Sequence, residues 1–197
     1  MSDVTQQKRP RADAERNRLR LLEAARAAFA AGAETVTLDQ VARDAGVGIG
    51  TLYRHFPTRE ALVEALYWKE LSELCAGAGE LLATLPPERA LRAWMDQFAG
   101  FVAAKQGMAD ALRAARAAGG VSVPQAREEM AVALRAILDA GVADGTLRGD
   151  VRPEDVVALI LGSLTATTVA GGQEQLARLF DLLLDAVRAP LPAGPGE

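Results

Sequence analysis

Residues 37–60, TLDQVARDAGVGIGTLYRHFPTRE, constrain the fold most, because helix starts, helix stops and glycines occur together in one short stretch. Thr37 and Gln40 have the T-x-x-Q spacing of a capping box, in which both side chains satisfy backbone N–H groups at a helix start. The spacing predicts a helix from Leu38. This helix should end at Gly46, because glycine readily adopts the left-handed conformation that follows many helices.

A second short helix is expected after the turn formed by residues 46–48. Leu52 and Phe56 lie four residues apart and therefore share one face of this helix. Pro57 should end it, because proline disfavours a helical conformation in the residue before it. Two short helices joined by a glycine-containing turn are typical of a helix-turn-helix, whose second helix can lie in the major groove of DNA.

Composition favours helices along the whole chain. Half of the 197 residues are hydrophobic, so a buried core can form, as one large domain or two small ones. Alanine is abundant and no stretch shows sustained alternation of apolar and polar residues, which predicts an all-α fold without a sheet. The net charge of −4 argues against a protein that coats nucleic acid indiscriminately.

The single cysteine, Cys75, excludes an intrachain disulfide and fits a reducing compartment. We interpret Cys75 as a small buried helix residue. No run approaches the ~18 apolar residues of a membrane span, and the basic start of the chain lacks the apolar centre of a signal peptide. A soluble, cytoplasmic protein without membrane contact is therefore expected.

Glycines, prolines and capping residues divide the rest of the chain into helices, which brings the expected total to about nine. The predicted ranges are about 13–31, 58–77 or slightly beyond, 86–106, 108–118, 122–145, 153–170 and 173–188. Residues 1–12 are interpreted as a mobile basic arm and residues 190–197, PLPAGPGE, as a flexible tail.

The segment AGVGIGTLYRHFPTREAL, within residues 13–67, closely resembles the signature of the TetR family of bacterial transcriptional regulators. RAWMDQFAGFVAAKQGMADAL and GTLRGDVRPEDV further resemble the C-terminal domain of the SbtR-like subgroup. The resemblance implies an arm and helix-turn-helix DNA-binding domain over residues 1–57. A helical ligand-binding and dimerisation domain would follow over residues 58–189, ahead of the tail.

The resemblance also implies which residues meet DNA. Contacts to the DNA backbone are expected from Thr37, Thr51, Tyr53, His55 and Arg59. Base reading would fall to Ile49, Gly50, Thr51 and Arg54, which offer an apolar surface for thymine methyl groups and few bidentate donors.

Large, adaptable side chains gather in the central predicted helices, as a pocket for an apolar or amphipathic ligand requires. Packing in a plain core is the alternative for each of them. The candidate pocket residues are Leu66, Trp94, Met95, Phe98, Phe101, Met108, Met130 and Leu134, with Thr165 as a polar contact.

The last two predicted helices carry more apolar surface than one neighbour can cover. The helix at 153–170 is apolar nearly all round, and the apolar face of the helix at 173–188 is wider than one stripe. They predict a four-helix interface in a homodimer. Its candidate residues are Ile160, Leu164, Leu176, Leu179, Phe180 and Leu183.

No pattern of catalytic residues is present. The only histidine, His55, lies in the predicted recognition helix, and no zinc-protease, nucleophile-elbow or phosphate-loop motif occurs. We expect no enzyme activity, no cofactor and no metal. The prediction is a ligand-responsive repressor that binds a pseudo-palindromic operator as a dimer and responds to a small-molecule effector. The alternative, favoured by the acidic net charge, is a helical small-molecule carrier without specific DNA binding.

Overall fold

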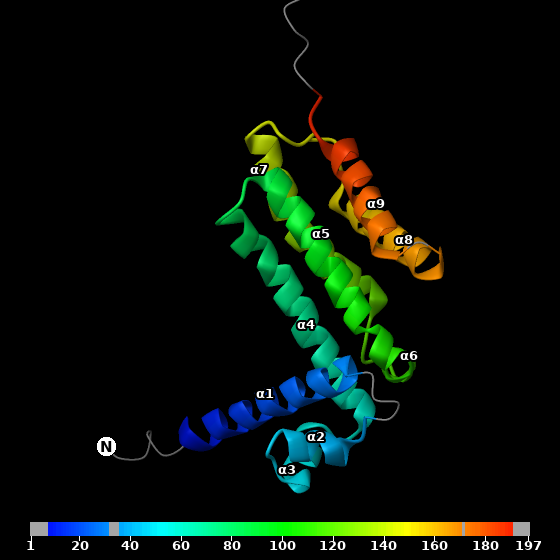
Figure 1. Ribbon diagram of the computed structural model, residues 1–197. Coiled ribbons are helices and arrows are strands. Elements are labelled where there is room, and N and C mark those ends of the chain that lie inside the picture. Colours follow the sequence, from blue (N-terminus) through cyan, green and yellow to red (C-terminus); the bar gives the residue numbers. More distant parts are fainter. Residues whose placement is uncertain (1–7, 32–35, 171, 191–197) are drawn as a thin grey trace, which may run out of the picture. The chain divides into compact units, whose positions relative to one another are not determined.

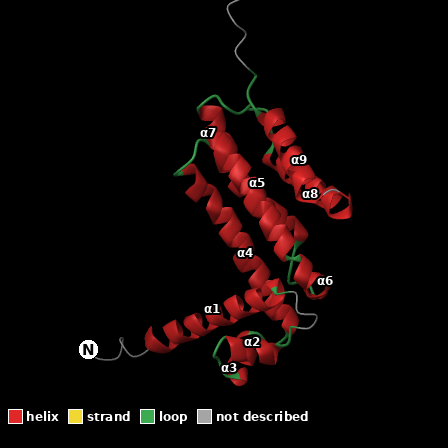
Figure 2. Ribbon diagram, viewed as in Figure 1, coloured by secondary structure: helices red, strands yellow, loops and turns green. Residues whose placement is uncertain are grey.

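The computed structural model describes residues 8–31, 36–170 and 172–190. Helices and one 3₁₀ turn make up the secondary structure of these residues, with no strand among them (Figure 2). The predicted all-α fold with about nine helices is confirmed. The helices are α1 (Lys8–Ala30), α2 (Leu38–Asp44), α3 (Ile49–His55), α4 (Arg59–Leu82), α5 (Pro87–Ala104), η1 (Gln106–Met108), α6 (Ala109–Ala117), α7 (Val123–Ala143), α8 (Pro153–Ala170) and α9 (Gly172–Val187).

The chain divides into two compact units. The first comprises the described parts of Met1–Lys69 together with Ala104–Ser122, and the second comprises Glu70–Ala103 with the described part of Val123–Glu197. α4 contributes its first half to one unit and its second half to the other. The domain boundary expected at residues 57 and 58 stays a prediction, because compactness within one chain does not show where an independently folding domain ends.

In the first unit α1 packs against α2 and α3, and η1 also contacts α1 (Figure 1). α1 begins at Lys8 rather than at Asp13. Pro10 does not prevent this early start, because the N–H groups in the first turn of a helix have no partner within the helix. The expected start of this helix at residue 13 is therefore wrong, while residues 1–7 lie outside the described ranges.

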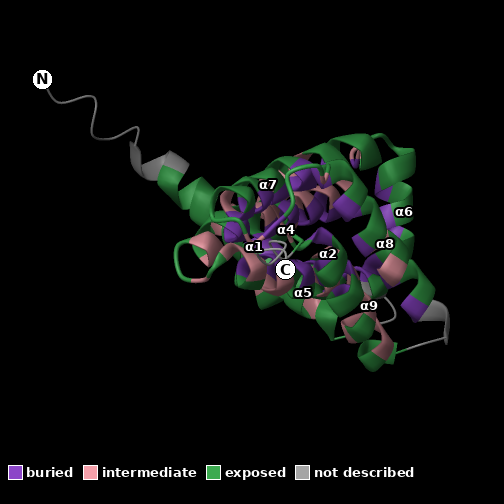
Figure 3. Ribbon diagram, turned by 90° about the horizontal axis from the view of Figure 1, so that it is seen from above, coloured by how far each residue is buried: buried purple, intermediate pink, exposed green. Residues whose placement is uncertain are grey.

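In the second unit α7 packs against α8, and α8 packs against α9 (Figure 1). Buried and exposed positions alternate along these helices, so each helix has one side that faces its neighbours (Figure 3). The indole N–H of Trp94, a fully buried residue of α5, donates to the carbonyl of Leu74 in α4 at 3.0 Å. The largest side chain of the core therefore has its polar atom satisfied.

The loop between α7 and α8 is tied to the end of α9. The backbone N–H of Arg148 donates to the carbonyl of Val187 at 3.0 Å, and Ala189 donates to Thr146 at 2.9 Å. The predicted tail begins at residue 190, and its residues 191–197 lie outside the described ranges. No helix in the described ranges is both long and apolar enough to cross a membrane.

Candidate nucleic-acid interface

The helix-turn-helix predicted from residues 37–60 is present as α2, a tight turn and α3. Buried side chains hold the two helices in place. Val41 and Ala42 of α2, Leu52 of α3 and Phe56 directly after α3 are all buried. α1 completes this small core with a buried stripe of Leu21, Leu22, Ala25 and Phe29.

The turn after α2 follows the Schellman pattern. Gly46 has a φ of +63°, the left-handed conformation that the sequence predicted for it. The N–H of Val47 donates to the carbonyl of Ala42 at 2.9 Å, and the N–H of Gly46 donates to that of Arg43 at 3.0 Å. These bonds satisfy the last carbonyls of α2 and fix the direction in which the chain enters α3.

Half of the predicted capping box is present at the start of α2. The hydroxyl of Thr37 accepts a hydrogen bond from the backbone N–H of Gln40 at 3.2 Å. The Gln40 amide bonds instead to Asp44, at 2.7 Å, and accepts from Arg43. Bonds to charged neighbours are stronger than a bond to a backbone N–H, which explains the difference. Thr37 is exposed, and its contact with DNA stays a prediction.

One side of α3 is open to solvent. Tyr53 is 49% exposed and Ile49 is 39% exposed, and Gly50 and Arg54 are exposed as well. At 100° per residue Gly50, Tyr53 and Arg54 lie about 100–160° away from Leu52, and Ile49 lies about 60° from it. Thr51 and His55 are half-buried between the two sides. Of the six predicted α3 residues, the structure therefore leaves four open to solvent, where a groove of DNA can meet them, and two partly covered.

Arg59, the predicted phosphate contact at the start of α4, is half-buried. Its guanidinium carbon lies 5.9 Å from the centre of the Phe29 ring in α1. Its Nε is buried without a hydrogen-bond partner among the described residues. Thr58 caps the same helix, accepting from the N–H of Ala61 at 3.1 Å. A phosphate contact by Arg59 stays a prediction.

Arg18 supports the end of α3, a role that the sequence interpretation missed. Its guanidinium carbon lies 4.8 Å from the centre of the Phe56 ring, so a cation from α1 covers the residue that ends α3. Stacking of this kind contributes about 0.5–1 kcal/mol at exposed sites. The available signal was periodicity, because Arg18 lies four residues before Leu22 on the buried stripe of α1.

The predicted ligand-pocket residues are distributed over both compact units. Trp94, Met95, Phe98, Met130 and Leu134 are buried in the second unit, where Phe101 is half-buried and Thr165 is exposed. Leu66 and Met108 are buried in the first unit. The Thr165 hydroxyl donates to the carbonyl of Leu161 in its own helix at 2.8 Å. Burial fits both a pocket lining and core packing, so the ligand pocket stays a prediction.

Four of the six predicted dimer residues are buried within the chain's own core. They are Ile160, Leu164, Phe180 and Leu183, while Leu176 and Leu179 are half-buried. Among the described side chains of α8 and α9, the large apolar ones left exposed are Leu159, at 56%, and Leu182, at 64%. The periodic apolar residues of α9 pack inward, and their neighbours in sequence face outward.

Cys75 is half-buried in α4. Burial raises the pKa of its thiol to about 11, and the negative charge of Glu129 adds to the shift. The thiol is therefore protonated at neutral pH. In the part of the chain that the structure describes, no three His, Cys, Asp or Glu side chains are grouped to hold a metal ion.

Known protein families match both the N-terminal and the C-terminal part of this chain. Residues 21–66 match the bacterial regulatory proteins of the tetR family, and residues 86–189 match the C-terminal domain of SbtR-like transcriptional regulators. A TetR transcriptional regulator from Streptomyces coelicolor is 45% identical, with 87% of this chain and 98% of that chain covered and a TM-score of 0.74. A TetR transcription regulatory protein from Mycobacterium vanbaalenii is 35% identical, with coverage of 91% and 99% and a TM-score of 0.69.

An HTH-type transcriptional regulator from Staphylococcus aureus is 37% identical over 62 residues, which are 31% of this chain. The match spans only 34% of the length of that curated relative. The similarity to the Streptomyces protein, in contrast, extends over nearly its whole length, and the SbtR-like match alone covers more than half of this chain. The chain therefore belongs to the TetR family of bacterial transcriptional regulators, with an SbtR-like C-terminal domain.

Proposed function

We propose that this regulator is a dimeric, ligand-responsive repressor that binds a pseudo-palindromic operator through α3. The observation that carries the proposal is the exposed side of α3, on a helix anchored by the buried Leu52 and Phe56. Ile49 offers an apolar contact for a thymine methyl group, and Arg54 offers a charged donor. The Tyr53 hydroxyl can donate to a phosphate oxygen, which fixes the position of the helix on the duplex.

Dimerisation would use the exposed sides of α8 and α9. Leu159 and Leu182 are more than half exposed on two helices that pack against each other. Covering both with the same helices of a second chain would remove them from water in a twofold interface. Two copies of α3 then bind half-sites about 34 Å apart, or a multiple of that spacing, so the operator has matching dyad symmetry.

Effector binding would reach DNA through α4. This helix is continuous from Arg59 to Leu82 and contributes to both compact units. In the first unit the indole N–H of Trp68 donates to the carbonyl of Gly120 at 2.9 Å, which ties α4 to the loop after α6. A shift of α4 caused by an effector would also move the first turn of α4, which follows α3 closely in the chain. Linkage then requires the effector and the operator to weaken each other's binding by the same factor.

The test is selection of a binding sequence from a random DNA library, followed by gel shift at several salt concentrations. Wild-type protein is compared with Arg54→Gln and with Arg89→Gln, which removes an exposed arginine of α5 in the second unit. We expect selection of a sequence with dyad symmetry, weakened binding by Arg54→Gln and unchanged binding by Arg89→Gln. A carrier protein would select no sequence and would retard DNA weakly, with binding lost as salt rises.

A further inference from the structure

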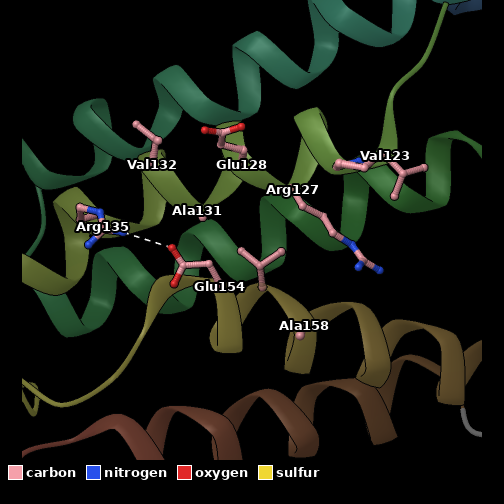
Figure 4. A pocket seen from close by; sticks show the side chains of 10 residues that line it. Val123, Arg127, Glu128, Ala131, Val132, Arg135, Glu154 and Ala158 are labelled. Carbon is pink, nitrogen blue, oxygen red and sulfur yellow. Dashed lines mark hydrogen bonds and ion pairs between the residues drawn. The ribbon is translucent and has the colours of Figure 1, made fainter. Parts of the chain in front are cut away.

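A cleft of about 520 Å³ lies between α7 and α8 in the second compact unit (Figure 4). Ala131 and Val157 are buried and form its apolar floor, while Val123 and Ala158 are exposed and lie at its rim. This volume falls in the range of about 300–1,000 Å³ that is usual for small-molecule sites. None of the residues predicted to form the ligand pocket lines it.

The charged groups at the cleft leave one cation unpaired. Arg135 donates to a carboxylate oxygen of Glu154 at 3.2 Å, and the other oxygen of Glu154 lies 3.7 Å from Nε of Arg152. Arg127 has no hydrogen bond or ion pair with any residue that the structure describes. The Glu128 carboxylate does not compensate Arg127, because it points toward α4, away from the α8 side of the cleft (Figure 4).

The α8 side of the cleft therefore carries more positive than negative charge. Arg127, Arg135, Glu128 and Glu154 line the cleft, and of these two carboxylates only Glu154 lies on the α8 side, where it pairs with Arg135 (Figure 4). Arg127 and Arg135 are eight residues apart on α7, which separates them by about 12 Å along the helix axis. An apolar surface of that length thus has a paired arginine at one end and an unpaired arginine at the other.

We propose that this cleft is a binding site for a small organic monoanion, whose apolar body lies on Ala131 and Val157 and whose acid group pairs with Arg127. The floor supplies affinity by removing apolar surface from water. The arginines select the sign of the charge, because they attract an anion and repel a cation. The regulatory meaning of this site rests on the proposed function, but binding itself is measured without DNA, so the two can fail separately.

The experiment is isothermal titration calorimetry of the full-length protein with octanoate, octylammonium and 1-octanol, three probes that share an apolar chain and differ in charge. We expect saturable binding of one octanoate per chain, with a dissociation constant between about 10 µM and 1 mM. Octylammonium and octanol should bind at least about tenfold more weakly. Arg127→Gln should weaken octanoate binding about tenfold or more, and Arg127→Lys should restore most of it.

Arg89→Gln is the matched control, because Arg89 is an exposed arginine of the same unit that does not line the cleft. It should bind octanoate like the wild type. Three results would overturn the proposal: no saturable octanoate binding, equal binding by wild type and Arg127→Gln, or equal binding of all three probes. A fourth result would also overturn it: the protein associates beyond the dimer, Arg127→Gln abolishes this association, and octanoate does not disrupt it. A second copy of the chain would then occupy the cleft.

Discussion

Replacing Tyr53 by phenylalanine removes one hydroxyl from the exposed side of α3 and keeps the ring. Tyr53 is 49% exposed, and its hydroxyl bonds to no residue that the structure describes. Tyr53→Phe should therefore change the free energy of unfolding by less than about 0.5 kcal/mol. A hydrogen bond to a charged group contributes about 1.5 kcal/mol at the lower end, so operator binding should weaken about tenfold for each half-site. A symmetric dimer loses the contact twice, which gives a loss of about a hundredfold.

Fluorescence anisotropy with labelled operator at one fixed salt concentration measures the affinity, and urea denaturation measures the stability. Leu52→Ala is the reference for a core residue, because Leu52 is fully buried and its truncation should cost about 2–5 kcal/mol of stability. Operator binding by Tyr53→Phe equal to that of the wild type would refute the phosphate contact. A stability loss comparable with that of Leu52→Ala would show that the predicted exposed side of α3 is wrong.

Three further predictions concern the turn, the dimer and the thiol. Gly46→Ala should lower the free energy of unfolding in urea by about 1–2 kcal/mol, because a residue with a Cβ is strained at a φ of +63°. No atom lies within 4 Å of the added Cβ, so the loss comes from the backbone conformation alone. An unchanged urea midpoint would contradict this. Leu182→Arg should give a folded monomer in sedimentation equilibrium, because this side chain is 64% exposed, whereas Leu183→Arg should unfold the chain. A dimeric Leu182→Arg protein would exclude this part of α9 from the interface. Cys75 should react slowly with iodoacetamide at neutral pH, and the reaction rate should rise about tenfold per pH unit up to the raised pKa of about 11. A rate that stops rising at about pH 8.5, the usual pKa of a free thiol, would contradict the shift.

Local signals predicted the parts of the fold that depend on nearby residues. Gly46 ends α2 because the Schellman turn uses only bonds between residues 42 and 47, and Pro57 lies where α3 has ended. The exposed side of α3 followed from the spacing of Leu52 and Phe56, since two buried positions four residues apart define the opposite side.

The features that sequence reasoning missed depend on contacts between helices. α8 is apolar on most sides, so periodicity does not tell whether Ile160 or Leu159 faces the neighbouring helix, and the structure buries Ile160. The candidate pocket stays a prediction for a related reason: large side chains such as Trp94 fill a core as well as they line a cavity. Periodicity along α1 can place Arg18 on the buried stripe, but it does not reveal that the partner of its stack is Phe56, which lies far away in sequence.

In the proposed complex, the two copies of α3 in the dimer lie in two major grooves of an operator with dyad symmetry. Hydroxyl-radical footprinting of the dimer on a selected operator tests it most directly, because this method maps contacts to each strand of the duplex. We predict two protected segments related by a dyad, with centres about 34 Å apart or a multiple of that spacing, and loss of both with Arg54→Gln under conditions that keep the protein folded. A single protected segment, or uniform weak protection that Arg54→Gln leaves unchanged, would contradict this arrangement.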